Sequence, residues 1–343
     1  MTRHLMLLAP SANRVYAGEA ACLATGELLL SAPFVTAAEP GTVAGVDYLA
    51  FETDEPAQLG AAELQVLARQ SAALALFATE GELLRPVELP DALVLDDDLV
   101  TIPKYPGKTN EQFTQLLLNG TLSQVATRTT GPLAVLDPLA GRGTTLMVAW
   151  LLGHHGYGVE GDTKAVEQLS AYLKTWLRRK RIKHTADTTP VRREGKAIGK
   201  RFDAKLTTEH LEMTVFTGDT RQSQYLYGKK KFDAIVTDAP YGVVHGAHQA
   251  SDVRGHAGKR DRSPAGLIRE ALPVWASQLK DGGALGMSWN TFGLTREDLA
   301  GLMAENGLEP QLGTQWLGFG HRVDSSIHRD LMVATKPRQE VRA

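Results

Sequence analysis

The chain has 343 residues, of which 43% are hydrophobic and 22% are charged, with a formal net charge of −2. The length indicates two domains, and the ordinary composition predicts a soluble globular protein rather than a disordered or fibrous one. The single cysteine, Cys22, excludes an internal disulfide and a cysteine-rich zinc site, and it suits a reducing cytoplasm. The N-terminal apolar run is too short for a signal peptide, and no stretch approaches the ~20 apolar residues of a membrane span. We therefore expect a cytoplasmic protein with no membrane association.

The charges are distributed unevenly along the chain. Residues 1–100 carry four Lys or Arg against fifteen Asp or Glu, whereas residues 174–205 carry twelve against three. A polyanion would be repelled by the first region and attracted by the second. The basic stretch is either a solvated, partly disordered loop or a segment that orders on nucleic acid, and the two interpretations are compatible.

Residues 1–98 predict a small α+β domain, and residues 99–343 predict a second unit. In the first, LMLLA, VDYLAFET and ALALFAT have the composition of strands, and EPAQLGAAELQVLARQSA has a helical pattern. In the second, strands alternate with helices, which predicts a doubly wound parallel α/β sheet. The expected parallel strands are residues 133–137, 156–160, 213–218, 232–238 and 283–289.

The second unit is also expected to end in an antiparallel pair of strands and to contain two flexible insertions. Residues 311–319 and 329–336 follow with a short connection and predict an antiparallel pair at the end of the sheet. Residues 184–205 and 244–264 are expected to be flexible insertions.

The stretch LAVLDPLAGRGTT, residues 133–145, combines a strand end with a glycine turn. The strand ends at Asp137, Gly141 and Gly143 make a tight turn, and a helix begins near Thr144. Glycines let the backbone approach a ligand closely, and the N-terminus of the helix presents unpaired N–H groups. The combination favours a nucleotide-type site over an ordinary turn between a strand and a helix.

Acidic residues follow the next two strands. Glu160 lies at the tip of the second strand, where a carboxylate can accept hydrogen bonds from both ribose hydroxyls of an adenosine. Asp162 is better placed as a helix N-cap. Asp219, just beyond the third strand, could accept from an adenine amino group or could cap a turn. Because neither a GxGxxG motif nor a Walker lysine is present, the expected ligand is a nucleoside without a large phosphate group, namely S-adenosylmethionine.

The stretch FDAIVTDAPYG places chemical groups directly after a strand that has the pattern of full burial. Asp238 ends the fourth strand at the same sheet edge as the cofactor residues. Its carboxylate and the Ala239 carbonyl can hold the two N–H groups of an exocyclic base amine, while Pro240 fixes the backbone. Tyr241 offers a flat face for an unpaired base. The amine would then attack a sulfonium methyl group in line, with positioning supplying much of the acceleration.

The segment after Tyr241 is rich in glycine, histidine and basic residues. Its histidines, His245, His248 and His256, lack the spacing of a structural zinc site, and we expect no metal. The segment is interpreted as a lid over the target base, with cations free to meet phosphates: Arg254, Lys259, Arg260 and Arg262.

Two of these motifs resemble those of a known family. DPLAGRGTT resembles the glycine motif of class I S-adenosylmethionine-dependent methyltransferases, and TDAPYG resembles the (D/N)PPY motif of those that act on exocyclic amines. In detail, residues 100–336 resemble the tRNA guanine-N2 methyltransferases that usually carry an N-terminal THUMP domain. IPKYPGKTNEQFTQLLLN stands where that group has its cofactor-closing helix. VDSSIHRDLMVATK resembles their closing hairpin, with Ser326 and Arg329 at matching positions.

The sequence departs from this family in two places. Ala239 stands where the family usually has proline, which is tolerable because the backbone carbonyl acts on the substrate. The N-terminal region is too short and too acidic for a complete THUMP module.

The resemblance implies a fold, a reaction and a set of site residues. The fold is a seven-stranded, Rossmann-like class I methyltransferase sheet with an antiparallel C-terminal pair. The reaction is methylation of guanine N2 in tRNA or another structured RNA. The implied catalytic residues are Asp238, Ala239, Pro240 and Tyr241. The implied cofactor-binding residues are Thr109, Asp137, Pro138, Ala140, Gly141, Gly143, Thr144, Glu160 and Asp219.

Two alternative functions stay open at this point. A DNA adenine-N6 or cytosine-N4 amino-methyltransferase uses the same chemistry but would normally need a target-recognition domain. An RNA-binding protein could retain the fold as a scaffold. The expected partner is RNA, with tRNA as the first candidate, bound through the basic segments 174–205 and 254–262. The oligomeric state is left open.

Overall fold

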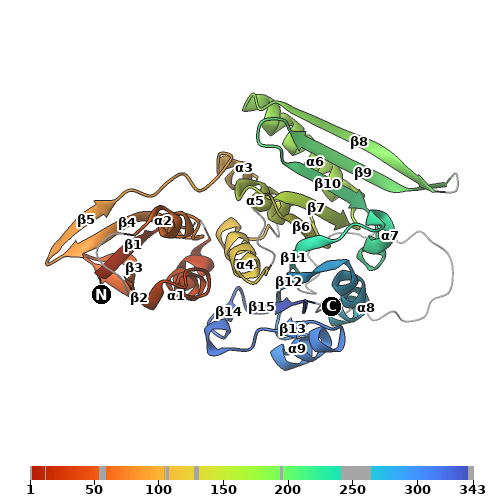
Figure 1. Ribbon diagram of the computed structural model, residues 1–343. Helices are drawn as coiled ribbons and strands as arrows, with labels where there is room; N and C mark the ends of the chain where they lie inside the picture. The colour runs from red at the N-terminus through yellow and green to blue at the C-terminus, as the bar shows by residue number, and fades with distance from the viewer. Residues whose placement is uncertain are drawn as a thin grey trace, which may run out of the picture.

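The computed structural model describes residues 2–11, 13–53, 59–103, 105, 108–126, 131–193, 196–240 and 264–338. These residues form two sheets, each with its own helices (Figure 1). Within them, none of the helices is long and apolar enough to cross a lipid bilayer.

The N-terminal sheet is antiparallel throughout and has the strand order β2-β3-β1-β4-β5. Its core packs Met6, Leu28, Phe51 and Leu76 between the sheet and the helices. In chain order its elements are β1 (Thr2–Leu8), α1 (Arg14–Ser31), β2 (Val35–Val43), β3 (Val46–Thr53), α2 (Ala61–Ala68), β4 (Ala73–Glu80) and β5 (Leu83–Val87). This confirms the expected small α+β unit.

The second sheet has the strand order β13-β15-β12-β11-β6-β7-β10-β9-β8. Its parallel centre consists of β6 (Ala134–Asp137), β7 (His155–Glu160), β10 (Glu212–Thr217), β11 (Phe232–Asp238) and β12 (Leu279–Asn290). Residues of β11 are buried except at its last position, as expected for a strand covered on both faces. The Rossmann-like doubly wound sheet predicted from the sequence is therefore confirmed.

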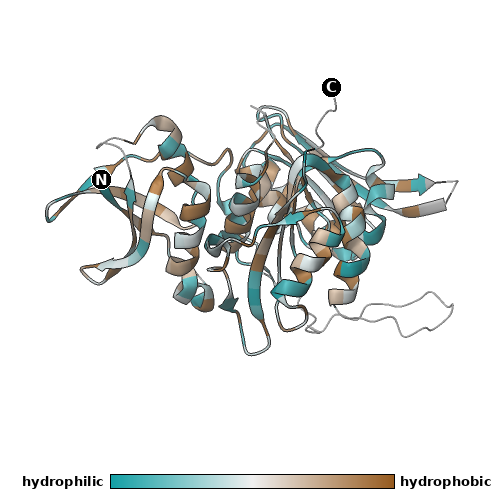
Figure 2. Ribbon diagram, turned by 60° about the horizontal axis from the view of Figure 1, so that its bottom comes forward, coloured by the Kyte–Doolittle hydropathy of each residue, from teal (hydrophilic) through white to brown (hydrophobic). Residues whose placement is uncertain are grey.

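Helices cover both faces of this sheet. They are α3 (Asp98–Thr101), α4 (Glu111–Ser123), α5 (Thr144–Leu151), α6 (Thr163–Arg179), α7 (Ser223–Tyr227), α8 (Pro264–Gln278) and α9 (Arg296–Glu305), with a 3₁₀ turn η1 (Thr220–Gln222) before α7. Figure 2 shows helices of this unit that carry both hydrophobic and hydrophilic residues, as amphipathic helices packed on a sheet do. α5 differs, because all of its residues are buried.

One sequence expectation about the insertions of this unit needs correction. The described residues of 184–205 are not a disordered insertion, because they form the paired strands β8 (His184–Arg193) and β9 (Lys196–Leu206). β9 pairs with β10, so the two strands widen the sheet. The hydrogen bonds of the ladder order this charged segment although it has few core residues. Apart from residue 264, the expected insertion 244–264 lies outside the described residues.

The antiparallel end of the sheet exists, but its strands differ from those expected. β15 (His328–Thr335) pairs antiparallel with both β12 and the two-residue strand β13 (Glu309–Pro310), and β14 (His321–Arg322) pairs with β15. Residues 311–319 were predicted as a strand, but they contain the 3₁₀ turn η2 (Thr314–Trp316) and bury Trp316 and Phe319. The apolar pattern there reflects burial rather than a strand.

Helix α4 lies between the two sheets. Its apolar face packs on the second sheet, and Gly286 of β12 lies so close that a side chain there would meet the Thr121 hydroxyl at 1.8 Å. Its other face carries amide side chains toward the N-terminal unit. Asn110 donates to the Ser11 hydroxyl at 2.9 Å, and Asn119 donates to Glu27 at 2.6 Å. The N-terminal unit thus braces the helix that resembles a cofactor-closing element.

Candidate active site

The glycine loop between β6 and α5 has two left-handed residues with different surroundings. Gly141 has φ 51°, and no atom lies within 4 Å of the position that a side chain would occupy. Gly143 has φ 80° and caps α5, and a side chain there would meet Leu169 of α6 at 2.8 Å. Gly143 therefore allows the helices to pack closely, while Gly141 leaves open space against the backbone.

Glu160 connects this loop to the tip of β7. Its two carboxylate oxygens accept from the Gly141 N–H and the Asp162 N–H, each at 2.7 Å. Burial raises the pKa of Glu160, and these backbone hydrogen bonds oppose that rise. Asp162 accepts from the Lys164 N–H at 2.9 Å as the N-cap of α6, which confirms the predicted cap.

Asp137 is almost fully buried at the end of β6. It accepts from the Leu139 N–H at 3.0 Å and from the Thr237 hydroxyl at 2.9 Å. Burial raises the pKa of Asp137 to about 6, and the negative charge of nearby Asp238 acts in the same direction. Hydrogen bonds, including one from Thr145, oppose this rise. Asp137 thus links the glycine loop to the end of β11.

The carboxylate of Asp238 is held from two sides. The Thr109 hydroxyl, just before α4, donates to Oδ2 at 2.5 Å, and the Ser288 hydroxyl of β12 donates to Oδ1. Ser288 is also the register partner of Asp238, and its carbonyl accepts from the Ala239 N–H at 2.8 Å. Two segments of the chain outside β11 therefore set the orientation of this carboxylate.

These residues surround one cavity of about 360 Å³. Pro138 and Gly143 belong to the same loop but do not line the cavity. Of the residues predicted from the sequence, its walls contain Thr109, Asp137, Ala140, Gly141, Thr144, Glu160, Asp238, Ala239 and Pro240. The structure thus brings six of the nine expected cofactor residues and three of the four expected catalytic residues to one edge of the sheet.

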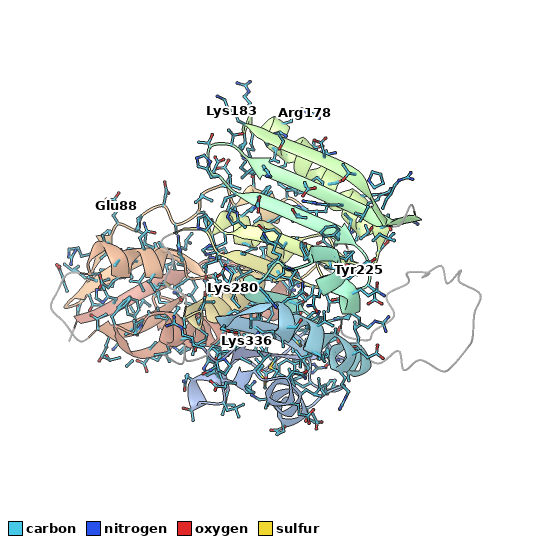
Figure 3. The ribbon with its side chains drawn as sticks, turned by 45° about the vertical axis from the view of Figure 1, so that its right-hand side comes forward. Glu88, Arg178, Lys183, Tyr225, Lys280 and Lys336 are labelled. Carbon is cyan, nitrogen blue, oxygen red and sulfur yellow. The ribbon has the colours of Figure 1, made fainter. Side chains whose placement is uncertain are left out.

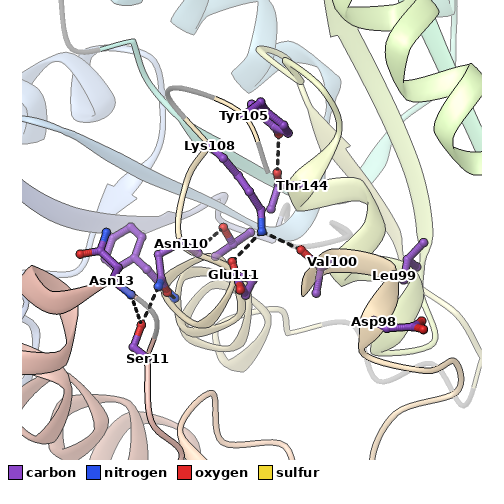
Figure 4. Close-up of polar contacts among 12 residues, drawn as sticks. Ser11, Asn13, Asp98, Leu99, Val100, Tyr105, Lys108, Asn110, Glu111 and Thr144 are labelled. Carbon is purple, nitrogen blue, oxygen red and sulfur yellow. Dashed lines mark hydrogen bonds and ion pairs between the residues drawn. The ribbon is translucent and has the colours of Figure 1, made fainter. Parts of the chain in front are cut away.

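Tyr105 and Arg142 also line the cavity, and the sequence did not single them out. Figure 4 shows Tyr105 beside Thr144. The Tyr105 hydroxyl lies 3.1 Å from the Thr144 hydroxyl, and the Arg142 guanidinium lies 4.2 Å from the centre of the Tyr105 ring. Burial raises the pKa of Tyr105. An aromatic residue shortly before α4 was the available signal, but nothing in the sequence indicated that it reaches the glycine loop.

Asp219 is not among the residues that line this cavity. It caps η1 by accepting from the Arg221 N–H at 2.9 Å, and its carboxylate pairs with the Arg221 guanidinium at 2.6 Å. It lies on the wall of a second cavity of about 830 Å³, beside α7. The cap was one of the two interpretations weighed for Asp219, and its contact with adenine stays a prediction.

Tyr241 and the expected lid residues lie outside the described residues. Within the residues that are described, no group of three His, Cys, Asp or Glu side chains is arranged to hold a metal ion.

Comparison with known proteins finds similarity at the level of the fold. No family model matches the chain. No curated protein matches it by sequence.

Solved structures with a similar fold include three methyltransferases of different substrates. A precorrin-6y methyltransferase from Geobacter metallireducens has 12% identity and a TM-score of 0.39, and the match covers 71% of this chain and 98% of the other. A 16S rRNA N2 methyltransferase from T. Thermophilus, in complex with AdoMet and guanosine, has 16% identity and a TM-score of 0.36, with 89% and 59% covered. Magnesium protoporphyrin IX methyltransferase from Synechocystis, with bound SAH, has 14% identity and a TM-score of 0.37, with 68% and 90% covered. Similarity this low carries no information about substrate, and the residues of the cavity must decide the chemistry.

Proposed function

We propose that the protein is an S-adenosylmethionine-dependent N-methyltransferase that acts on an exocyclic amine of a nucleobase, guanine N2 in tRNA or another structured RNA. The observation that carries this proposal is the position of Asp238. Its oriented carboxylate lines the same cavity as the Gly141 loop and Glu160. A cofactor held by the loop would therefore lie beside a group suited to hold an amine.

The cavity fits S-adenosylmethionine in three respects. Gly141 leaves space for a ligand against the backbone, and Glu160 can accept hydrogen bonds from ribose hydroxyls. Thr144 begins α5, whose N-terminus faces the same cavity. Bound there, the cofactor would supply an electrophilic methyl group on its sulfonium. No Walker-type lysine accompanies the loop, in keeping with a ligand that has no phosphate groups.

Asp238 would orient the amine for this transfer. Because Thr109 and Ser288 restrain the carboxylate, its oxygens can hold amine N–H groups without a loss of side-chain freedom on binding. The Ala239 carbonyl is the second candidate acceptor. A carboxylate is too weak a base to deprotonate a neutral aromatic amine, but it can accept the acidic proton once the nitrogen has been alkylated.

RNA as the substrate is supported by the charge of the chain. The segment 174–205 carries twelve Lys or Arg against three Asp or Glu, and a basic surface attracts a polyanion. The resemblance of residues 100–336 to the tRNA guanine-N2 methyltransferases favours guanine within that class. We place the protein in the cytoplasm as part of the same proposal.

We expect Asp238→Ala to lower turnover by at least about 10²-fold, because positioning of the amine is lost. The affinity for S-adenosylmethionine should change less than about threefold, since Asp238 holds the acceptor rather than the cofactor. Methyl transfer to total tRNA from labelled cofactor measures the first quantity, and calorimetry measures the second.

Asp162→Asn is the matched control, because Asp162 lines the same cavity but caps α6. Asparagine is an equally good cap, so turnover should stay near that of the wild type. Turnover by Asp238→Ala within tenfold of the wild type would contradict the catalytic assignment.

A further inference from the structure

Four exposed cations gather where α6 ends and β8 begins. We call them the distal basic cluster: Arg178, Arg179, Arg181 and Lys183. Figure 3 shows Arg178 and Lys183 at the same end of the molecule. In the part of the chain that the structure describes, no carboxylate lies within 4 Å of any of the four, although Lys180 between them pairs with Asp96 and Asp98.

Arg181 adopts a backbone conformation that costs free energy. Its φ is 57°, in the left-handed region just past the end of α6, where glycine is usual because other residues are strained. A long cationic side chain at a glycine position indicates that the side chain itself has a use.

The dipole of α6 explains only part of the cluster. Arg178 and Arg179 lie in the last turn, where positive charge favours the helix. Arg181 and Lys183 lie beyond the helix and are exposed. Stabilisation of α6 therefore does not account for them.

The cluster is far from the cavity. α6 begins next to Asp162, which lines the cavity, and its 17 residues at 1.5 Å each extend about 25 Å to the cluster. The exposed residues of α6 along this path include one carboxylate, Glu167, and Lys200 pairs with it at 2.6 Å. A polyanion that lies along α6 would meet no uncompensated acid of that helix.

We propose that the distal basic cluster binds the phosphate backbone of a folded RNA whose target base lies at Asp238. This rests on the proposed function and narrows its substrate class. A span of about 25 Å corresponds to on the order of eight base-pair steps of a duplex, so the substrate has a helix beside the target nucleotide. The acidic N-terminal unit, with four Lys or Arg against fifteen Asp or Glu in residues 1–100, does not offer this contact.

The test compares two RNA probes on the full chain by fluorescence anisotropy: a stem-loop with a stem of about ten base pairs and a single-stranded pentanucleotide. In the variant, glutamine replaces all four residues of the distal basic cluster. We expect the Kd for the stem-loop to rise about 30-fold or more. The slope of log Kobs against the logarithm of the salt concentration should become smaller in magnitude by about 3. The Kd for the pentanucleotide should change less than about twofold, because it cannot reach from the cavity to the cluster.

Two further variants exclude a general effect of charge or of unfolding. The matched control replaces four exposed cations elsewhere with glutamine, and it should bind the stem-loop like the wild type: Arg3, Arg14, Arg85 and Lys229. Arg181→Gly should raise the melting temperature, because it removes the left-handed strain, and yet it should bind the stem-loop about three- to fivefold more weakly.

The outcomes separate this inference from the proposed function. If the wild type methylates RNA but the cluster variant keeps its KM and salt dependence, the cluster assignment is overturned. If the wild type methylates no nucleic acid but the cluster variant loses stem-loop affinity, the assignment stands and the proposed reaction is wrong.

Discussion

At the scale of single residues, Glu160 both fixes the glycine loop and lines the cavity. Its carboxylate ties the Gly141 N–H to β7 and also faces the space where a ribose would lie. Hydrogen bonds to a charged acceptor contribute about 1.5–3 kcal/mol. We expect Glu160→Ala to weaken binding of S-adenosylmethionine by about 10- to 100-fold, and Glu160→Gln to weaken it less, as measured by calorimetry.

Asp219→Asn gives a contrast at the same scale. Asparagine keeps a side-chain oxygen that can cap η1 and accept from an adenine amino group, so this variant should weaken cofactor binding less than Glu160→Ala does. Equal affinities for the wild type and Glu160→Ala would show that Glu160 is not the ribose acceptor.

The sequence predicts the residues of this site that follow directly on strands. Asp137, Glu160 and Asp238 each end a buried strand, and parallel strands bring such ends to one edge. Ser288 could not be found in this way, because its contact with Asp238 depends on the register between β11 and β12. The contact between the Tyr105 and Thr144 hydroxyls could not be predicted either, because Tyr105 lies outside the helices and strands whose patterns the sequence reveals.

At the scale of elements, the close packing of α4 on β12 makes a sharp prediction. A side chain at Gly286 would meet Thr121 of α4 at 1.8 Å, so Gly286→Ala must displace the helix. We expect a loss of stability of about 1–3 kcal/mol in urea denaturation. Turnover should also fall, because α4 begins beside Thr109, which holds Asp238.

Gly301→Ala in α9 is the control, since no atom lies within 4 Å of the new methyl group. There the substitution should stabilise the protein by about 0.5–1 kcal/mol, because alanine favours the helix. If Gly286→Ala were as stable and as active as the wild type, α4 would not pack as described.

The sequence predicts the central strands well and the edges of the sheet less well. β11 is a short, uninterrupted run of buried residues, which is the pattern of a strand covered on both faces. The hairpin β8–β9 is rich in charge, so its composition resembles that of a disordered segment, and pairing with β10 orders it. Residues 311–319 are apolar because Trp316 and Phe319 are buried, and burial alone does not distinguish a strand from a turn.

At the scale of the whole molecule, a buried acid lies where α1 of the N-terminal unit meets α4 of the second unit. Glu27 of α1 is 1% exposed and accepts from the Ser71 N–H at 3.0 Å and from Asn119 of α4 at 2.6 Å. Burial raises the pKa of Glu27 from 4.5 to about 7, although these hydrogen bonds oppose the rise. The folded protein therefore binds a proton between pH 4.5 and 7 that the unfolded chain does not bind.

Stability from Glu27 should accordingly be present below pH 4.5 and be lost as the pH rises to about 7. A difference of this size corresponds to about 3 kcal/mol. We expect Glu27→Gln to reduce the loss of stability between pH 5 and pH 8, as measured by urea denaturation. If the free energy of unfolding of the variant depended on pH as that of the wild type does, Glu27 would not be a buried acid with a raised pKa.

We propose that the boundary between the two units lies between residues 98 and 99. It falls within α3, where Asp98 and Leu99 accept hydrogen bonds from Trp176 and Tyr172 of α6. The N-terminal unit then has a role that its acidic surface does not suggest, because it holds α4 and, through α4, the residues around Asp238.

The most direct test of the central claim is nucleoside mass spectrometry of tRNA and, in a separate reaction, of DNA, each incubated with the protein and S-adenosylmethionine carrying an isotopically labelled methyl group. The account predicts labelled N2-methylguanosine with the wild type and none with Asp238→Ala. Label found in methyladenine or methylcytosine of DNA, or in no nucleoside at all, would contradict it.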